Sequence, residues 1–318
     1  MILLLALACS DSDFGLSQVK DDHGVPDEQD TAALVDTSGE DLDTGTPPED
    51  TGTPPTEDSA PATDTGGDVP ATDTGDDPPP ADDCTETDDL VYVISRDDGT
   101  LYAFDPAGLA FTSLGRVNCG TSQTPGSMSV SRDGVAYVRY ADNSLYALDL
   151  ATMTCSRTAY SDRSGFDSFG MGYSTDSADT WREQLYVANE DTLATLDPST
   201  GALTTIGRMP SQSELTGDAD GDLWAMLPLE SPAEIVQVDK STGSTLASIR
   251  LPSFPDPGDI DAFAFATWSG DFYVFVREYG MGMTTDVYKV TSAGTMPKVL
   301  TDVGFDVVGA GTSTCAPS

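Results

Sequence analysis

The sequence predicts an all-β fold: a five-bladed β-propeller with a C-terminal strand closing the first blade, preceded by a disordered acidic tether. Three observations predict this arrangement. The aromatic residues are concentrated in the C-terminal part of the chain, a two-strand cassette recurs there five times, and an unpaired strand pattern remains at its end. Alternation of apolar and polar residues between Asp-Gly and Thr-Gly turns, without a helical period, is typical of β-sheets.

Composition excludes several classes of function. The 318 residues include 54 Asp and Glu against 14 Lys and Arg, a formal net charge of -40. This charge excludes nucleic acid as a partner and leaves contact with a membrane to a lipid anchor. The single histidine, His23, lies in the acidic segment. Histidine-centred triads and histidine acid/base chemistry are therefore not expected.

The chain divides into three segments: residues 1–9, 10–83 and 84–318. Residues 10–89 hold 25 acidic residues, one Lys, one Phe and neither Trp nor Tyr, so this stretch cannot bury a core. All three Trp and all eleven Tyr follow it. The folded unit is thus about 230 residues long, a size that all-β propellers reach as one domain.

Residues 1–8 read MILLLALA, an apolar run too short to span a bilayer but of signal-sequence length, and Cys9 follows directly. Ala6-Leu7-Ala8-Cys9 resembles the end of a bacterial lipoprotein signal, in which small residues precede a cysteine that is lipidated. The basic residues that normally open such a signal are missing, so an ordinary N-terminal segment is the alternative. The resemblance implies lipidation at Cys9 and a place in the bacterial cell envelope, at the outer membrane or cell surface.

Residues 10–83 predict a disordered linker. Asp-Thr-Gly recurs at 43–45, 50–52, 64–66 and 73–75 among proline-rich stretches, and such sequence stays extended through charge repulsion and polyproline preference. A flexible coil of about 74 residues reaches on the order of 50 Å, enough to hold a domain away from a membrane. Calcium binding by these Asp residues is the weaker interpretation, since their spacing lacks the ligand pattern of a calcium loop.

Five cassettes of two strands and a hairpin turn follow, which is the repeat signature of a propeller. They are residues 90–94 with 100–106, 135–138 with 144–149, 184–188 with 193–201, 222–226 with 235–243, and 271–275 with 286–290.

Most cassettes are preceded by a further strand, predicted at residues 127–130, 215–217 and 262–267. The first cassette lacks such a strand, while residues 307–314 form an extra one at the end of the chain. We therefore expect the last strand to complete the first blade, which leaves no sheet edge unpaired around the ring.

Four cysteines follow Cys9, an even number that predicts two disulfides in an exported chain. Three pairings are possible. Ring closure favours Cys84 with Cys315, which leaves Cys119 with Cys155. Zinc binding is the alternative, and no short-spaced cysteine pair supports it.

Acidic residues recur where the opening strands begin. They are Asp167, Glu214, Asp261 and Asp306, at intervals of 47, 47 and 45 residues. Four blades would thus place a carboxylate at one mouth of the central channel, where converging charges raise one another's pKa or hold a cation such as Ca²⁺. The alternative is that they accept backbone hydrogen bonds at strand starts. A second acidic stretch, residues 218–222, resembles the start of a calcium loop but also fits a hairpin turn.

A family resemblance rests on the motifs together: the lipobox, the tether, the hairpin turn 197–201 (Asp-Pro-Ser-Thr-Gly), Phe-Gly-Met-Gly at 169–172 and Val-Gly-Ala-Gly-Thr-Ser-Thr-Cys-Ala-Pro at 308–317. The hairpin is similar to those of quinoprotein-type secreted propellers, and the whole layout resembles uncharacterised propeller lipoproteins of myxobacterial type. That resemblance implies a fold and a location but no chemistry, and no quinone ligand set is visible.

The sequence therefore favours a non-catalytic module that binds a protein, a glycan or a small ligand, monomeric and without a cofactor except for the hypothetical Ca²⁺. The alternative is a glycosidase-like, carbohydrate-active enzyme that uses the carboxylates at the strand starts, because such enzymes act through a pair of acids. An envelope-assembly subunit is a third interpretation, which rests on architecture alone.

Overall fold

The computed structural model describes residue 84 and residues 89–318, except for 162–165, 179 and 281–282. The predicted lipidation site Cys9 and the predicted linker 10–83 lie outside the described residues. In the part that is described, twenty strands and one short 3-10 helix, η1 (Pro257–Asp259), are present. None of the helical structure found there has the length and apolar character that crossing a membrane requires.

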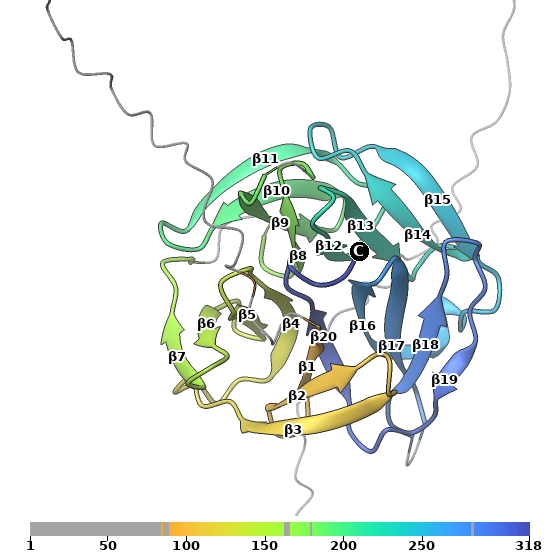
Figure 1. Ribbon diagram of the computed structural model, residues 1–318, viewed down its shortest axis with the longest axis horizontal. Helices are drawn as coiled ribbons and strands as arrows, with labels where there is room; N and C mark the ends of the chain where they lie inside the picture. Colours follow the sequence, from red (N-terminus) through yellow and green to blue (C-terminus); the bar gives the residue numbers. More distant parts are fainter. Residues whose placement is uncertain (1–83, 85–88, 162–165, 179, 281–282) are drawn as a thin grey trace, which may run out of the picture. The chain divides into compact units, whose positions relative to one another are not determined.

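The strands form five antiparallel sheets of four strands each, arranged as blades around a common axis (Figure 1). Blade 1 consists of β20 (Val307–Gly311), β1 (Val91–Ser95), β2 (Thr100–Asp105) and β3 (Ala110–Arg116). Blade 2 consists of β4 (Pro125–Val130), β5 (Val135–Tyr140), β6 (Leu145–Asp149) and β7 (Thr154–Arg157). The predicted five-bladed all-β fold is confirmed.

The other three blades follow in the same order from the axis outward. Blade 3 consists of β8 (Gly170–Thr175), β9 (Glu183–Asn189), β10 (Thr192–Asp197) and β11 (Ala202–Arg208). Blade 4 consists of β12 (Glu214–Gly217), β13 (Leu223–Leu227), β14 (Ala233–Val238) and β15 (Thr245–Leu251). Blade 5 consists of β16 (Ile260–Trp268), β17 (Asp271–Glu278), β18 (Asp286–Val290) and β19 (Lys298–Leu300).

The innermost strands β4, β8, β12, β16 and β20 contact one another in a closed ring around the axis. They are packed so closely that small residues are needed. A Cβ atom on Gly170 of β8 would lie 2.2 Å from the carbonyl oxygen of Ser213, and one on Gly309 of β20 would lie 2.8 Å from the amide nitrogen of Met128. Both distances are far below van der Waals contact, so backbone packs directly against backbone.

The last strand closes the ring as the sequence predicted. β20 pairs with β1 in antiparallel register, with Tyr92 opposite Gly311 and Val93 opposite Ala310. Disulfides join Cys84 to Cys315 and Cys119 to Cys155, as expected. The closing strand is shorter than predicted and ends at Gly311, because the next residues leave the sheet and fold into a turn.

Apolar and aromatic side chains pack between neighbouring blades. Phe104 of blade 1 lies edge-on to Phe275 of blade 5, with ring centroids 5.7 Å apart, and both are fully buried. Trp224 of blade 4 packs in the same way against Phe272 of blade 5, at 5.0 Å. Each such pair contributes about 0.5–1.5 kcal/mol beyond its burial. The repeated aromatic positions therefore hold adjacent blades together.

Candidate functional site

The axis has two ends, which differ in chemistry. At the front mouth the innermost strands begin, and at the rear mouth they end. All four predicted acids belong to the front mouth by their place in the chain. Glu214 opens β12, Asp261 is the second residue of β16, Asp306 directly precedes β20, and Asp167 lies three residues before β8.

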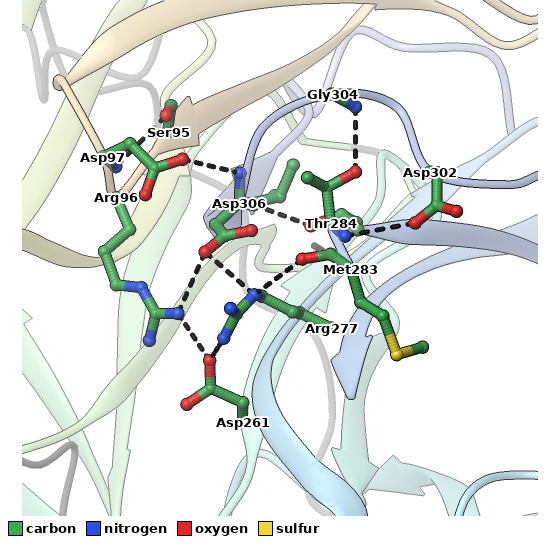
Figure 2. A network of polar contacts seen from close by, with 12 residues as sticks. Ser95, Arg96, Asp97, Asp261, Arg277, Met283, Thr284, Asp302, Gly304 and Asp306 are labelled. Carbon is green, nitrogen blue, oxygen red and sulfur yellow. Dashed lines mark hydrogen bonds and ion pairs between the residues drawn. The ribbon is translucent and has the colours of Figure 1, made fainter. Parts of the chain in front are cut away.

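Asp261 and Asp306 lie together in a cluster with Arg96 and Arg277 (Figure 2). Arg96 Nη2 is 2.5 Å from Asp261 Oδ2 and 3.0 Å from Asp306 Oδ2. Arg277 contacts the same two oxygens, pairing with Asp261 through Nη1 and with Asp306 through Nε at 2.9 Å. Each carboxylate is therefore shared by two guanidinium groups, and the four charges compensate one another.

Backbone contacts hold this ion cluster in place. The amide of Arg96 donates to the carbonyl oxygen of Asp306 at 2.8 Å, and the amide of Asp306 donates to Asp97 Oδ2 at 3.3 Å. Arg277 Nε also donates to the carbonyl oxygen of Met283 at 3.3 Å. Asp261 and Arg277 come from blade 5, while Arg96 and Asp306 belong to blade 1. The ion cluster thus bridges the two blades at which the ring closes.

The cluster is partly open to solvent. Side chains of Arg96 and Arg277 are 29% and 20% exposed, whereas those of Asp261 and Asp306 are 15% and 8% exposed. A network with this degree of burial contributes more than an isolated surface pair, which is worth at most about 1 kcal/mol. Its guanidinium groups are the part that a molecule at the front mouth can touch.

Glu214 has a different environment, since it is buried with 4% of its surface exposed. Ser127 Oγ of blade 2 donates to Glu214 Oε2 at 2.8 Å. Burial raises the pKa of the Glu214 carboxyl to about 8, although the bond from Ser127 and the charge of Arg139 oppose that change. Glu214 therefore holds a proton at neutral pH and can donate a hydrogen bond as well as accept one.

Arg139 is buried near Glu214, on β5 directly opposite Ser127. Its Nε donates to the carbonyl oxygen of Phe169 at 3.2 Å, and its guanidinium carbon lies 5.7 Å from the centroid of the Phe169 ring. Burial lowers the pKa of this guanidinium, although it stays charged at any physiological pH. Blades 2, 3 and 4 thus meet around one polar group at the front mouth.

Two hydroxyl groups in the loop before β12, those of Ser211 and Ser213, have no hydrogen-bond partner among the described residues. Ser213, directly before Glu214, is 2% exposed. Buried polar groups in proteins are almost always paired. The Ser213 hydroxyl is enclosed, as are Ser211 Oγ in the same loop and Thr312 Oγ1 after β20, so its burial keeps a molecule in solution from reaching it.

The four predicted acids are thus not equivalent. Asp261 and Asp306 meet through shared arginines, Glu214 is buried against Ser127, and Asp167 is exposed. Within the described ranges, no three His, Cys, Asp or Glu side chains are grouped closely enough to hold a metal ion. The axial cation stays a prediction. Asp218 Oδ1 accepts from the amides of Asp220 and Asp222, so residues 218–222 form a turn.

Sequence reasoning missed the arginines of the front mouth. Arg96, Arg139 and Arg277 all lie at the end of the second strand of their blades, opposite or next to the start of the innermost strand. Basic residues are scarce in this chain. Because they recur at one position of the blade, these arginines could have indicated that the carboxylates at the strand starts are neutralised.

A surface groove of about 350 Å³ lies on blade 4. Its lining combines apolar side chains with charged ones, among them Leu227, Val236, Glu234 and Arg250. Glu234 already accepts hydrogen bonds from Arg250 Nε at 3.2 Å and from Ser248 Oγ at 2.7 Å. Glu234 and Arg250, two charged residues of this groove, are thus paired with each other.

Three of the solved structures similar to this chain share 9% to 15% sequence identity with it. No family model matches the chain, and no curated protein matches it in sequence. Solved structures similar to it include a protein of unknown function from Bacteroides caccae, at 9% identity and a TM-score of 0.41, covering 70% of this chain and 97% of that one. A calcium-binding regucalcin from Agrobacterium tumefaciens has 13% identity and a TM-score of 0.37, covering 67% of this chain and 70% of that one. A further protein of unknown function, from Bacteroides thetaiotaomicron, has 15% identity and a TM-score of 0.43, covering 70% and 58%.

Proposed function

We propose that the chain is an exported, lipid-anchored propeller that acts as a non-catalytic binding module in the bacterial cell envelope, with the front mouth as its binding face. Two disulfides support export, because such bonds persist in oxidising compartments outside the cytosol. The lipobox at Cys9 and the acidic linker support anchoring at the outer membrane or cell surface.

The binding role is supported by the pairing of acids with arginines at the front mouth. Asp261 and Asp306 are both committed to Arg96 and Arg277. A glycosidase needs one carboxylate free to act as nucleophile or base and another free to act as acid. Compensated charges at the ends of strands instead offer fixed donors and acceptors, which suits recognition of a polar surface on a glycan, a small ligand or a protein.

The guanidinium groups of Arg96 and Arg277 are the most exposed groups of the ion cluster. Guanidinium groups donate hydrogen bonds, so they favour a ligand that presents acceptors, such as sugar hydroxyl groups. Binding through such groups would need no change in the protonation of the ion cluster.

One observation favours the enzymatic alternative. Glu214 carries a pKa raised to about 8 by burial, as the general acid of a glycosidase does. Its side chain is nearly inaccessible, however, and it is already bonded to Ser127. A substrate would have to displace that contact before it could receive the proton.

Screening the purified chain on glycan arrays and on glycoside substrates separates the two roles. We expect retention of a glycan or protein partner without turnover, and we expect Arg277→Gln to abolish retention while Arg208→Gln, an exposed control on blade 3, leaves it intact. Hydrolysis that Glu214→Gln abolishes would establish the enzyme instead.

Two further parts of the proposal have their own tests. Labelling with a radioactive or clickable fatty acid should mark the wild-type chain and not Cys9→Ser, and equal labelling would refute lipid anchoring. A Ca²⁺ ion at the front mouth would have to replace an arginine beside Asp261 or Asp306, and calorimetric titration with CaCl₂ without heat of binding would refute it. The module is expected to be a monomer, which light scattering tests.

A further inference from the structure

The chain does not leave the propeller after β20. Thr312, Ser313, Thr314 and Ala316 are only 4%, 2%, 0% and 8% exposed. The amides of Cys315 and Ala316 donate to Ser313 Oγ at 3.1 Å and to the Ser313 carbonyl oxygen at 3.0 Å. Residues 312–317 therefore form a compact turn, which we call the rear segment.

The rear segment crosses the rear mouth of the axis. Thr314 Oγ1 donates to Glu183 Oε2 at 2.8 Å. Glu183 is the first residue of β9, opposite Thr175 at the rear end of β8, and so belongs to blade 3. Blade 1, from which the rear segment comes, is two blades away. The segment therefore spans the rear ends of the innermost strands from blade 1 to blade 3, and Figure 1 shows the chain end near the centre of the ring.

Other blades hold the same segment. The amide of Ser269, in the turn between β16 and β17 of blade 5, donates to the carbonyl oxygen of Pro317 at 2.5 Å. Glu183 also accepts at 2.8 Å from the amide of Arg132, in the turn that follows β4 of blade 2. The disulfide from Cys315 to Cys84 adds a covalent bond to the residue at which the predicted linker meets the propeller.

We infer that the rear segment is a built-in plug, which closes the rear mouth and leaves the front mouth as the end from which a ligand can reach the axis. The plug also fixes the linker to the closed end through Cys84. Given the lipid anchor proposed above, the front mouth is then presented on the side of the propeller away from the attachment of the linker. A surface-displayed receptor would expose its binding face in this way.

Hydrogen exchange measured by mass spectrometry on the oxidised full chain tests the plug without any ligand or membrane. We expect the amides of Cys315 and Ala316 to exchange as slowly as those of β20. Thr314→Val keeps the shape of the side chain but removes its bond to Glu183 and should speed exchange of these two amides by roughly fivefold to a hundredfold. Thr242→Val, which removes an exposed hairpin hydroxyl, is the control and should leave them unchanged.

A second variant examines whether the segment shields the axis. A chain that ends at Gly311 and carries Cys84→Ser should exchange faster at the rear end of β8, where the amide of Thr175 donates to Asp218. The front ends of the same strands should be unaffected. Rapid exchange of the rear segment in the wild type, or an unchanged rate at Thr175 in a shortened chain that folds, would overturn the plug. Neither result would bear on the proposed binding role. In the same way, a failure to bind a ligand would not bear on the plug.

Discussion

Replacing Glu214 by Gln makes the pH dependence of stability a direct test of the front mouth. Burial raises the pKa of this carboxyl from 4.5 to about 8. The folded state therefore holds the proton over a pH range in which the unfolded chain has released it. The contribution of this proton to the free energy of unfolding is fully present below pH 4.5 and is lost as the pH rises toward 8.

The magnitude follows from the shift in pKa. One unit corresponds to 1.36 kcal/mol, so a change from 4.5 to about 8 gives an upper limit of about 5 kcal/mol lost between pH 4.5 and pH 9. Gln at this position cannot ionise and keeps an oxygen that can accept the bond from Ser127. Glu214→Gln should thus match the wild type near pH 5 and exceed it in stability by several kcal/mol at pH 9.

Urea unfolding at pH 5, 7 and 9, followed by tryptophan fluorescence, measures this difference. Because any loss of negative charge stabilises so acidic a chain at high pH, Glu190→Gln on the exposed surface is the matched control. The reasoning is refuted if wild type, Glu214→Gln and Glu190→Gln lose the same free energy of unfolding between pH 5 and pH 9.

Three further predictions concern stability, each measured by thermal and urea unfolding. Cys84→Ser opens a loop of 231 residues, and the chain-entropy relation gives a loss of about 5.5 kcal/mol in the free energy of unfolding. Cys119→Ser opens a loop of 36 residues and should lose about 4 kcal/mol. A larger loss for Cys119→Ser than for Cys84→Ser would contradict the relation. Arg277→Ala leaves Asp261 and Asp306 with Arg96 alone and should lower the free energy of unfolding by about 2 kcal/mol. Unchanged stability would show that the ion cluster does not hold the two blades together. Gly170→Ala should lower the free energy of unfolding by about 3 kcal/mol or prevent folding, because the added Cβ meets backbone atoms. Gly258→Ala is the control and should leave stability unchanged, because the space around this glycine is open. Equal effects of the two variants would argue against close packing at the axis.

The ring could be predicted from the sequence because its information is local and repeated. Each cassette carries its own alternation and its own turn, and the leftover strand after residue 306 has one place to pair once the other blades are complete. The pairing of Cys84 with Cys315 followed from the same closure. The predicted end of that strand, residue 314, is wrong. Residues 312–314 are buried like a strand, but they leave the sheet and turn across the rear mouth.

The candidate site could be predicted only in part, since spacing places a residue on a strand but does not give its partner. The interval between the acids predicted that Asp261 and Asp306 lie where the innermost strands of neighbouring blades begin, and Asp261 is the second residue of β16 while Asp306 directly precedes β20. Arg96, one of the two arginines that join them, is 165 residues from Asp261 along the chain, and its contact with Asp261 depends on how blades 5 and 1 pack. Burial of Glu214 likewise depends on Ser127 of another blade.

Charge compensation changes what the front mouth is able to attract. A propeller with many more acids than bases would gather repelling carboxylates where its innermost strands begin. At this end the chain avoids that repulsion in two ways, by sharing Arg96 and Arg277 between Asp261 and Asp306, and by burying Glu214 so deeply that it keeps its proton. The field that a divalent cation would feel is therefore weaker than the count of acids suggests. Fixed arginine donors remain beside carboxylate acceptors, and this pattern matches a neutral polar ligand such as a glycan better than a metal ion.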